Sequence, residues 1–178
     1  MAFQPRTVLL KDGRTATVRP GTSADSENIV ALRDAVGAEG VFVMSERSIR
    51  TPEELRKEVE TNDPTTVAWV VAEVEGRVIG EALVFRGRWK KNAHTASLGM
   101  AVRKEHRGLG IGEALLRAGI EWARSVGVRK FRLEVFATNG RAIHLYHKLG
   151  FVVEGRLKDE VILEGKPVDE VQMALWLS

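Results

Sequence analysis

The sequence contains no cysteine, so disulfides, thiolate metal sites and a cysteine nucleophile are excluded. Long apolar runs are also missing: the longest uninterrupted one, Val67 to Ala72, has only six residues. The sequence opens Met-Ala-Phe-Gln-Pro-Arg, which lacks a basic segment followed by an apolar core. These absences argue against a membrane span and a signal peptide, and they predict a cytoplasmic protein.

Aromatic residues are sparse, and Tyr146 is the only tyrosine among the 178 residues. The isoelectric point of about 9.4 would suit nucleic acid. However, the basic residues do not interleave with a row of aromatic ones, so we do not predict nucleic-acid binding. Hydrophobic residues at 44% and charged residues at 29% are ordinary for a globular protein. The length is most simply explained by a single domain spanning residues 1–178.

The net charge of +3 conceals two segments of opposite sign. Residues 81–150 contain 14 Lys or Arg and 5 Asp or Glu. Residues 22–63 contain 5 Lys or Arg and 10 Asp or Glu. The first segment therefore favours an anionic ligand and the second a cationic one.

Hydrophobic periodicity predicts an α+β fold with a mixed, mostly antiparallel central sheet flanked by helices. The predicted strands cover residues 7–10, 15–18, 67–74, 77–85, 93–102, 130–136, 151–163 and 168–176. The predicted helices cover residues 22–36, 51–61, 115–126 and 139–150. One strand-helix-strand crossover is expected, between the strands at 93–102 and 130–136. Residues 37–50 are predicted to form a loop that contacts the substrate.

The junction before the third predicted helix reads Arg107-Gly108-Leu109-Gly110-Ile111-Gly112. Alternating glycines at a helix start expose backbone N–H groups at the positive end of the helix dipole, which suits phosphate or pyrophosphate. A nucleoside-triphosphate loop would need Lys-Ser or Lys-Thr next, and Glu113-Ala114 follows instead. A dinucleotide fingerprint requires a different glycine spacing and is the least favoured alternative.

From Gly99 to Phe151 the chain resembles the GNAT superfamily of acetyl-CoA-dependent N-acetyltransferases. Arg107, Gly110 and Gly112 match the pyrophosphate loop of that family, Arg/Gln-x-x-Gly-x-Gly/Ala. A second match comprises Asn139, Ala142, Ile143, Leu145, Tyr146, Lys148, Leu149, Gly150 and Phe151. The resemblance implies a GNAT-like fold and acetyl-CoA as cosubstrate, with its pyrophosphate loop at the single crossover.

Carried over residue by residue, the resemblance also implies which positions bind the cosubstrate. The pyrophosphate is expected at Arg107, Gly108, Leu109, Gly110, Ile111 and Gly112. The pantetheine arm is expected along Met100, Ala101 and Val102, on a strand that splays from its neighbour. Asn139 and Ala142 complete the predicted acetyl-CoA contacts, and Asn139 also reads as a helix cap. No metal is expected, because no His, Asp or Glu cluster has metal-ligand spacing.

Two residues are candidates for proton transfer. Tyr146 occupies the position where the family commonly places a general acid, and a phenol is protonated at neutral pH. Glu134, twelve residues earlier, resembles the base of ribosomal-protein N-terminal acetyltransferases. The alternatives are that Glu134 forms a salt bridge to Arg132 or Arg141, or that Glu81 or a water chain is the base.

The predicted function is acetyl transfer from acetyl-CoA to a primary amine by direct attack in a ternary complex. We expect a small cationic amine or an amino-acid-like acceptor, because residues 22–63 are acidic. A protein N-terminus as acceptor and a non-catalytic acetyl-CoA sensor are alternatives. Exposed strands at a sheet end make a homodimer plausible, while no membrane partner is expected.

Overall fold

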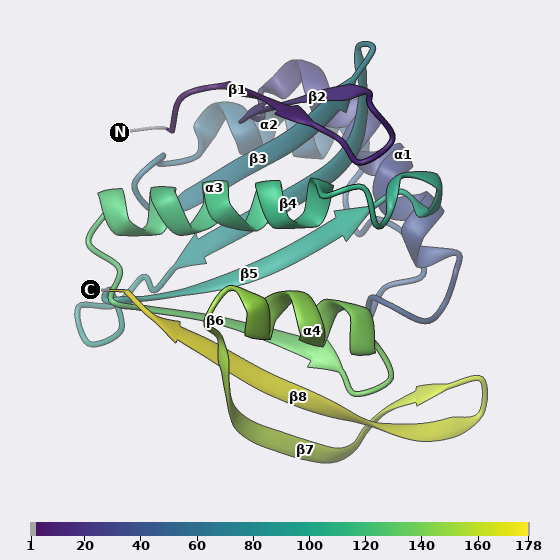
Figure 1. Ribbon diagram of the computed structural model, residues 1–178. Helices are drawn as coiled ribbons and strands as arrows, with labels where there is room; N and C mark the ends of the chain where they lie inside the picture. Colours follow the sequence, from purple (N-terminus) through teal and green to yellow (C-terminus); the bar gives the residue numbers. More distant parts are fainter. Residues whose placement is uncertain (1–2, 178) are drawn as a thin grey trace.

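The computed structural model describes residues 3–177, which form one sheet with helices on both faces (Figure 1). The strands are β1 (Arg6–Leu9), β2 (Thr15–Pro20), β3 (Val67–Val74), β4 (Arg77–Arg86), β5 (Thr95–Val102), β6 (Lys130–Phe136), β7 (Val152–Leu163) and β8 (Lys166–Trp176). The helices are α1 (Ser26–Gly37), α2 (Pro52–Thr61), α3 (Ile111–Ser125) and α4 (Gly140–Lys148), with short 3₁₀ turns η1 (Ser23–Asp25) and η2 (Lys104–His106).

The strand order is β1-β2-β3-β4-β5-β6-β8-β7, and β5 and β6 are the parallel neighbours. The other neighbouring strands in this order pair antiparallel. Helix α3 makes the crossover between β5 and β6, since parallel neighbours need a long connection. The predicted fold class, a mostly antiparallel sheet with one crossover, is confirmed.

Hairpin turns and helix caps form where local sequence favours them. Glu75-Gly76 and Glu164-Gly165 adopt positive φ angles of 50° and 77°, and of 50° and 75°, as tight hairpin turns require. Thr51 Oγ1 accepts from the Glu54 N–H at 3.2 Å, and the Glu54 carboxylate accepts from the Thr51 N–H at 2.8 Å. Thr51 is therefore the N-cap of α2, and Pro52 is the first residue of the helix.

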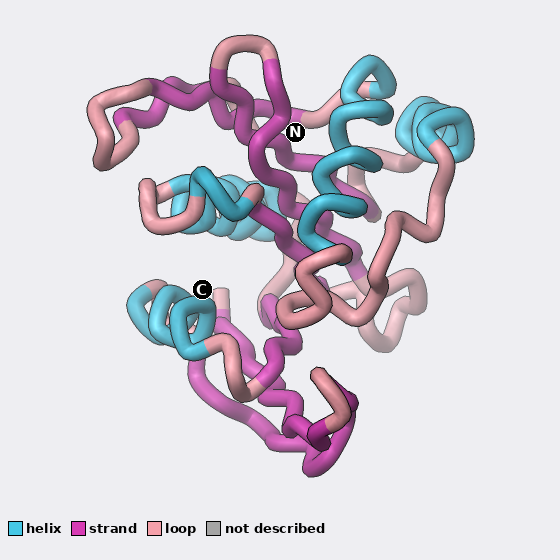
Figure 2. Tube along the Cα trace, turned by 90° about the vertical axis from the view of Figure 1, so that its right-hand side faces the viewer, coloured by secondary structure: helices cyan, strands magenta, loops and turns pink. Residues whose placement is uncertain are grey.

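Two apolar clusters lie on opposite faces of the sheet. Helix α3 supplies Ile111, Leu115 and Leu116 to the larger cluster, and each of these side chains is at most 1% exposed. The smaller cluster joins α1 and α2 to β3, with Leu32 and Leu55 fully buried. Each such side chain stabilises the fold by ~1.5–3 kcal/mol relative to an exposed one. Figures 1 and 2 show α3 and α4 on one face and α1 and α2 on the other.

Some element boundaries differ from the sequence prediction. Helix α3 begins at Ile111 rather than Leu115, because Gly110 adopts a left-handed conformation, φ 102°, and serves as the N-cap. A 3₁₀ turn precedes α1, because the Asp25 carboxylate accepts from the Thr22 N–H at 2.8 Å and tightens the chain there. The glycine motif therefore contains the helix start itself.

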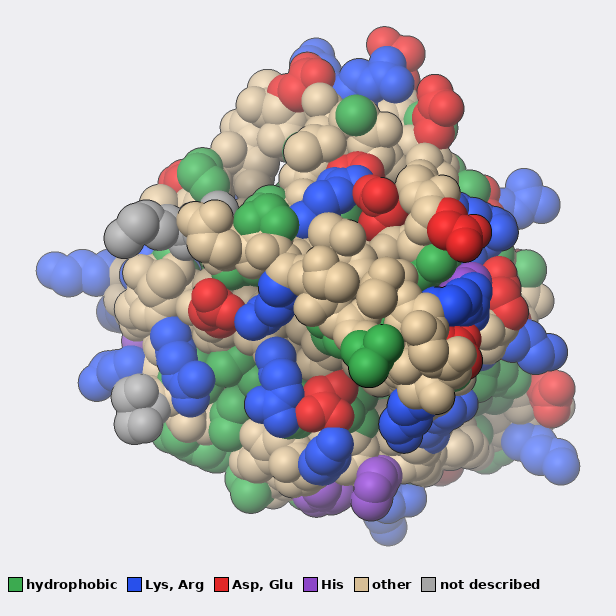
Figure 3. All heavy atoms as spheres, turned by 45° about the horizontal axis from the view of Figure 1, so that its top comes forward, with side chains coloured by type: hydrophobic (Ala, Val, Ile, Leu, Met, Phe, Trp, Pro, Cys, Tyr) green, Lys and Arg blue, Asp and Glu red, His purple; other side chains and the backbone are tan. Residues whose placement is uncertain are grey.

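Charges of both signs share the molecular surface. On the face drawn in Figure 3, Lys and Arg side chains lie among Asp and Glu side chains. Within residues 3–177 no helix is long and apolar enough to cross a membrane.

Candidate active site

A cleft opens where β5 and β6 diverge. Their parallel pairing runs from Thr95 opposite Lys130 to Leu98 opposite Leu133, and it stops there. Beyond Leu98, β5 stays paired with β4 as far as Val102, so one edge of β5 faces the gap. The cleft has a volume of about 1040 Å³, enough for a large cosubstrate and a small second ligand. The splay expected from the family resemblance is therefore present (Figures 1 and 2).

The glycine loop forms the end of the cleft next to α3. The amide N–H groups from Gly108 to Glu113 have no acceptor among the described residues, whereas the Ala114 N–H begins the helical pattern by donating to the Gly110 carbonyl. Gly108 and Gly110 have φ angles of 82° and 102°, which disfavour residues with a side chain. The loop thus presents a row of free donors at the positive end of a helix dipole.

Most of the predicted cosubstrate residues line this cleft, but two do not. The lining residues of that set are Met100, Ala101, Val102, Arg107, Gly108, Gly110, Gly112, Asn139 and Ala142. The Ile111 side chain is 1% exposed in the core, and Leu109 packs against the same cluster. Leu109 and Ile111 can therefore face a ligand only through their backbone N–H groups.

The Arg107 guanidinium binds a carboxylate of the protein, whereas its position in the motif predicts contact with the pyrophosphate. Its guanidinium donates to both carboxylate oxygens of Glu39, at 2.7 and 2.5 Å, and its Nε donates to the Val102 carbonyl at 2.9 Å. The Phe42 ring lies 4.6 Å from the Arg107 Cζ atom. The side chain therefore ties the loop between α1 and α2 to the glycine loop, and it is less available to a phosphate.

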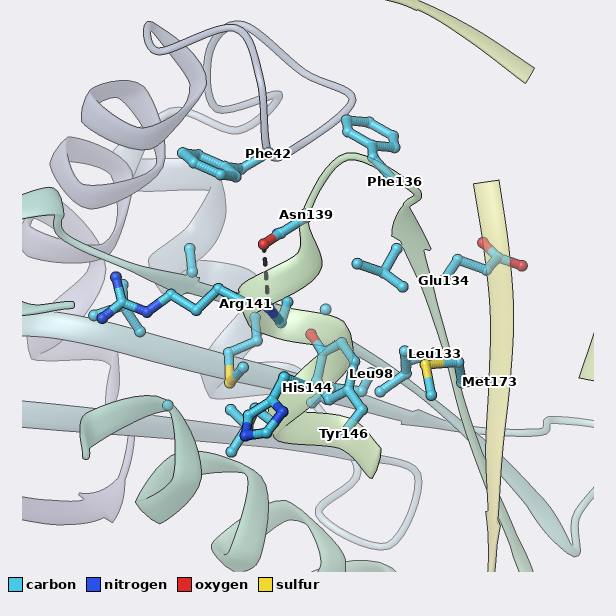
Figure 4. Close-up of a pocket in the computed structure, with 18 of the residues that line it drawn as sticks. Phe42, Leu98, Leu133, Glu134, Phe136, Asn139, Arg141, His144, Tyr146 and Met173 are labelled. Carbon is cyan, nitrogen blue, oxygen red and sulfur yellow. Dashed lines mark hydrogen bonds between the residues drawn. The ribbon is translucent and has the colours of Figure 1, made fainter. Parts of the chain in front are cut away.

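The structure adds Arg141 to the residues that line the cleft, a residue that the sequence suggested only as a salt-bridge partner of Glu134. Arg141, near the start of α4, lines the cleft, and its Nη2 lies 2.1 Å from where a Cβ on Gly108 would be. Figure 4 shows the Arg141 side chain extended across the cleft, away from Glu134. Its position next to the free loop amides makes it a candidate phosphate ligand. In the sequence, Arg141 follows the turn between β6 and α4. Its position next to the glycine loop depends on the strand order of the sheet, so it could not be predicted from the sequence alone.

Tyr146 lies on the inner face of α4. The ring packs against Phe151 with centroids 5.8 Å apart, and the side chain is 7% exposed yet lines the cleft. Burial raises the pKa of Tyr146 to about 12, so the phenol keeps its proton at neutral pH. Asn139 begins the helix, with its Oδ1 accepting from the Ala142 N–H at 3.2 Å (Figure 4). The predicted cap is confirmed.

Glu134 lies on β6 just beyond the last residue paired with β5. It is exposed, it lines the cleft, and its carboxylate accepts from Gln172 Nε2 on β8 at 3.4 Å. Within the described chain it forms no salt bridge, and Arg132 donates to Ser97 Oγ at 2.9 Å instead. The alternative of a salt bridge to Arg132 or Arg141 is therefore wrong. Phe136, on the same face of β6 as Glu134, is 4% exposed and also lines the cleft.

Glu81, the rival base, is held elsewhere. Its carboxylate accepts two hydrogen bonds from Arg33, at 2.6 and 3.0 Å, and its side chain is 7% exposed. Burial raises the pKa of Glu81, and the Arg33 guanidinium opposes the rise. Glu81 does not contribute to the lining of the cleft.

The loop predicted to contact substrate does reach the cleft. Phe42, Val43 and Met44 line it, between α1 and α2. The acidic residues of 22–63 do not line it: Asp25 pairs with Arg19, Glu39 with Arg107 and Glu58 with Arg50. The acidic segment therefore supplies no carboxylate that would contact an acceptor in the cleft directly. Among the described residues, no group of three or more His, Asp or Glu could hold a metal ion.

Comparison with known proteins places the chain in a family. Residues 37–151 match the model of the acetyltransferase (GNAT) family, and the chain belongs to it. The predicted family and enzyme class, an acetyltransferase, are thereby confirmed. The dinucleotide alternative is not supported, since β5 and β6 alone pair parallel among the described strands.

Two curated relatives illustrate the range of the family. The L-amino acid N-acetyltransferase AaaT of Escherichia coli is 32% identical over 63% of this chain and 70% of its own. Streptothricin acetyltransferase of Streptomyces lavendulae is 31% identical over 67% of this chain and 60% of its own. The chain thus spans about three fifths to seven tenths of the length of these relatives.

Solved structures cover more of the chain. A GNAT-family acetyltransferase from Streptococcus pneumoniae has a TM-score of 0.85 at 27% identity, covering 91% of this chain and 99% of its own. A phosphinothricin acetyltransferase from Sinorhizobium meliloti, solved in complex with AcCoA, has a TM-score of 0.82 at 26% identity, covering 92% and 89%.

Proposed function

We propose that this protein transfers the acetyl group of acetyl-CoA to a primary amine by direct attack in a ternary complex. The observation that carries the proposal is the divergence of β5 from β6. It brings the free loop amides, the unpaired edge of β5 and the Tyr146 phenol to one cleft. The pyrophosphate would accept from the amides between Gly108 and Glu113. Backbone groups of Met100, Ala101 and Val102 would bind the pantetheine arm and polarise the thioester carbonyl.

The chemistry needs one proton removed and one supplied. The neutral amine attacks the thioester carbon, so a C–N bond forms and the C–S bond then breaks. Glu134 takes the proton that the amine nitrogen loses, and Tyr146 donates a proton to the leaving thiolate sulfur. The raised pKa of Tyr146 means that the phenol carries its proton throughout the neutral pH range and is available as a donor. No acyl-enzyme is needed, and the chain has no cysteine to form one.

The acceptor is most simply a small amine. Phe42 and Met44 line the cleft together with residues of β6 and β8, and these side chains would cover a small ligand. Relatives named for L-amino acids, streptothricin and spermidine support a small-molecule amine. A protein N-terminus is a second candidate, because a ribosomal-protein-alanine N-acetyltransferase from Brucella melitensis has a TM-score of 0.80 at 27% identity.

The test is acetyl-CoA consumption, followed as free thiol release, with amino acids, polyamines, aminoglycosides and short peptides as acceptors. Acceptor-dependent release that falls in Tyr146→Phe supports the proposal and identifies the acceptor class. Binding of acetyl-CoA without release for any acceptor would favour a non-catalytic sensor. If acetyl-CoA does not bind, the proposal is wrong.

A further inference from the structure

Glu170 on β8 differs from the other buried carboxylates of the described chain. Arg19 donates to both carboxylate oxygens of Asp25 at 2.8 Å. Arg33 donates to both carboxylate oxygens of Glu81. Glu170 is 7% exposed, and within residues 3–177 its side chain has neither a hydrogen-bond partner nor an ion pair. A carboxylate with so little access to solvent and no partner in the described chain leaves its oxygens available to a ligand in the cleft.

The Glu170 side chain lines the same cleft as Glu134. In the antiparallel pairing of β6 with β8, Glu134 lies opposite Gln172 and Phe136 lies opposite Glu170. Residues directly opposite each other, and residues two apart on one strand, share a face of the sheet. Glu134 and Glu170 are therefore diagonal neighbours on one face, with side chains roughly 7 Å apart.

The charge around Glu170 is negative. Burial raises its pKa first, and the carboxylates of Glu134 and Glu160 raise it further. No Lys or Arg of the described chain forms a salt bridge with it. Figure 4 shows Glu134 beside β8, on the side of β6 away from Leu133. Lys130 and Arg132 of β6 also line the cleft, but Lys130 pairs with Glu154 and Arg132 donates to Ser97 Oγ. Neither residue forms an ion pair with Glu170, so a bound amine would supply the cation that Glu170 lacks.

We propose that Glu170 binds a second positively charged group of the acceptor, while the amine that reacts faces Glu134. The inference rests on the proposed acetyl transfer and narrows its substrate class: the preferred acceptors carry two cationic groups separated by a short chain. A monoamine would satisfy Glu134 alone and leave Glu170 unpaired. Specificity for diamines over monoamines thus comes from the C-terminal hairpin.

Equilibrium binding tests this without requiring turnover. The affinities of 1,4-diaminobutane and butylamine are measured by calorimetry on the CoA-saturated protein. Kinetics with acetyl-CoA follow on the same pair of amines. The wild type should bind the diamine roughly tenfold more tightly, the scale of one charge-assisted hydrogen bond. Glu170→Gln should lose that preference because its affinity for the diamine falls while its affinity for butylamine is unchanged. Glu170→Asp, which keeps the charge, should retain part of the preference.

Glu160→Gln is the matched control, because it removes the same charge from an exposed residue outside the cleft lining. It should leave the preference for the diamine within about twofold of wild type, as expected for a screened charge. Acetyl-CoA affinity and thermal unfolding verify that each variant is folded. The inference is overturned if the wild type shows no preference or if Glu170→Gln keeps it. Preferential diamine binding without thiol release would instead contradict the proposed acetyl transfer.

Discussion

The two walls of the cleft offer a ligand different kinds of groups. The wall made by β5, the glycine loop and α3 offers unpaired backbone N–H groups and a strand edge. The wall made by residues 37–50, β6 and β8 offers side chains, among them Phe42, Glu134 and Glu170. Backbone recognition requires particular glycines at fixed spacing, whereas side-chain recognition can be assembled from distant positions. The first therefore leaves a sequence motif and the second does not.

The largest effect is expected at Tyr146, which lines the cleft from α4. Tyr146→Phe keeps the ring packed on Phe151 and removes only the hydroxyl. We expect kcat to fall ~100-fold, with acetyl-CoA affinity unchanged. Because the pKa of Tyr146 is raised to about 12, its ionisation should cause no loss of wild-type kcat below about pH 10. A folded variant with unchanged kcat would remove Tyr146 from the mechanism.

A substitution in the glycine loop should impair ligand binding only at the wall made by β5, the glycine loop and α3. Gly110→Val places a branched side chain at φ 102°, which costs ~1–3 kcal/mol of strain and moves the loop amides. The Kd for acetyl-CoA should rise ~30-fold, measured by calorimetry. Gly127→Val is the control, since φ is 78° there and a Cβ on either glycine meets nothing within 4 Å. Equal losses of affinity in both variants would show a general effect of strain.

The Arg107–Glu39 ion pair connects the two walls, so breaking it should affect both. Glu39→Gln weakens the contact that ties residues 37–50 to the glycine loop. We expect the Kd of acetyl-CoA and the KM of the acceptor each to rise about threefold. Glu46→Gln, in the same loop and without an ion pair among the described residues, should change neither constant. A change in only one constant would show that the walls act independently.

The smallest expected effect is on the unfolding midpoint, and it concerns Glu170 on β8. Since the pKa of Glu170 is raised in the folded protein, ionisation costs folding free energy. That cost is absent below the unfolded-chain pKa of about 4.3, grows as pH rises and is complete above the folded pKa. Glu170→Gln removes the cost, so its unfolding midpoint at pH 7 should exceed that of wild type by ~3 °C.

The comparison of unfolding midpoints at pH 7 and pH 4 checks this assignment. Most of the gain of Glu170→Gln should disappear at pH 4, where wild-type Glu170 is mostly protonated in both the folded and the unfolded chain. A gain of equal size at both pH values would mean that packing, rather than charge, accounts for it. Glu160→Gln, which is exposed, should change the midpoint little at either pH.

The fold was largely predictable because local patterns decided it. The hairpin turn at Glu75-Gly76, the Thr51 cap and the alternation along β6 each act over a few residues. The contents of the cleft were less predictable. The acidic segment 22–63 predicted the acceptor site, yet none of its carboxylates lines the cleft, and Asp25 and Glu39 pair with Arg19 and Arg107. Counting charges along a chain cannot reveal which of them neutralise one another.

By itself the sequence determined the order of strands and helices, the glycine loop at the start of α3 and the family to which the chain belongs. These depend on backbone conformation and hydrophobic periodicity, which neighbouring residues set. Only the tertiary structure decided that Glu81 is buried on Arg33, that Arg107 binds Glu39, and that Glu170 lies unpaired in the cleft. Each of these depends on contacts between residues far apart in sequence, and burial and charge pairing exist only once the sheet has formed.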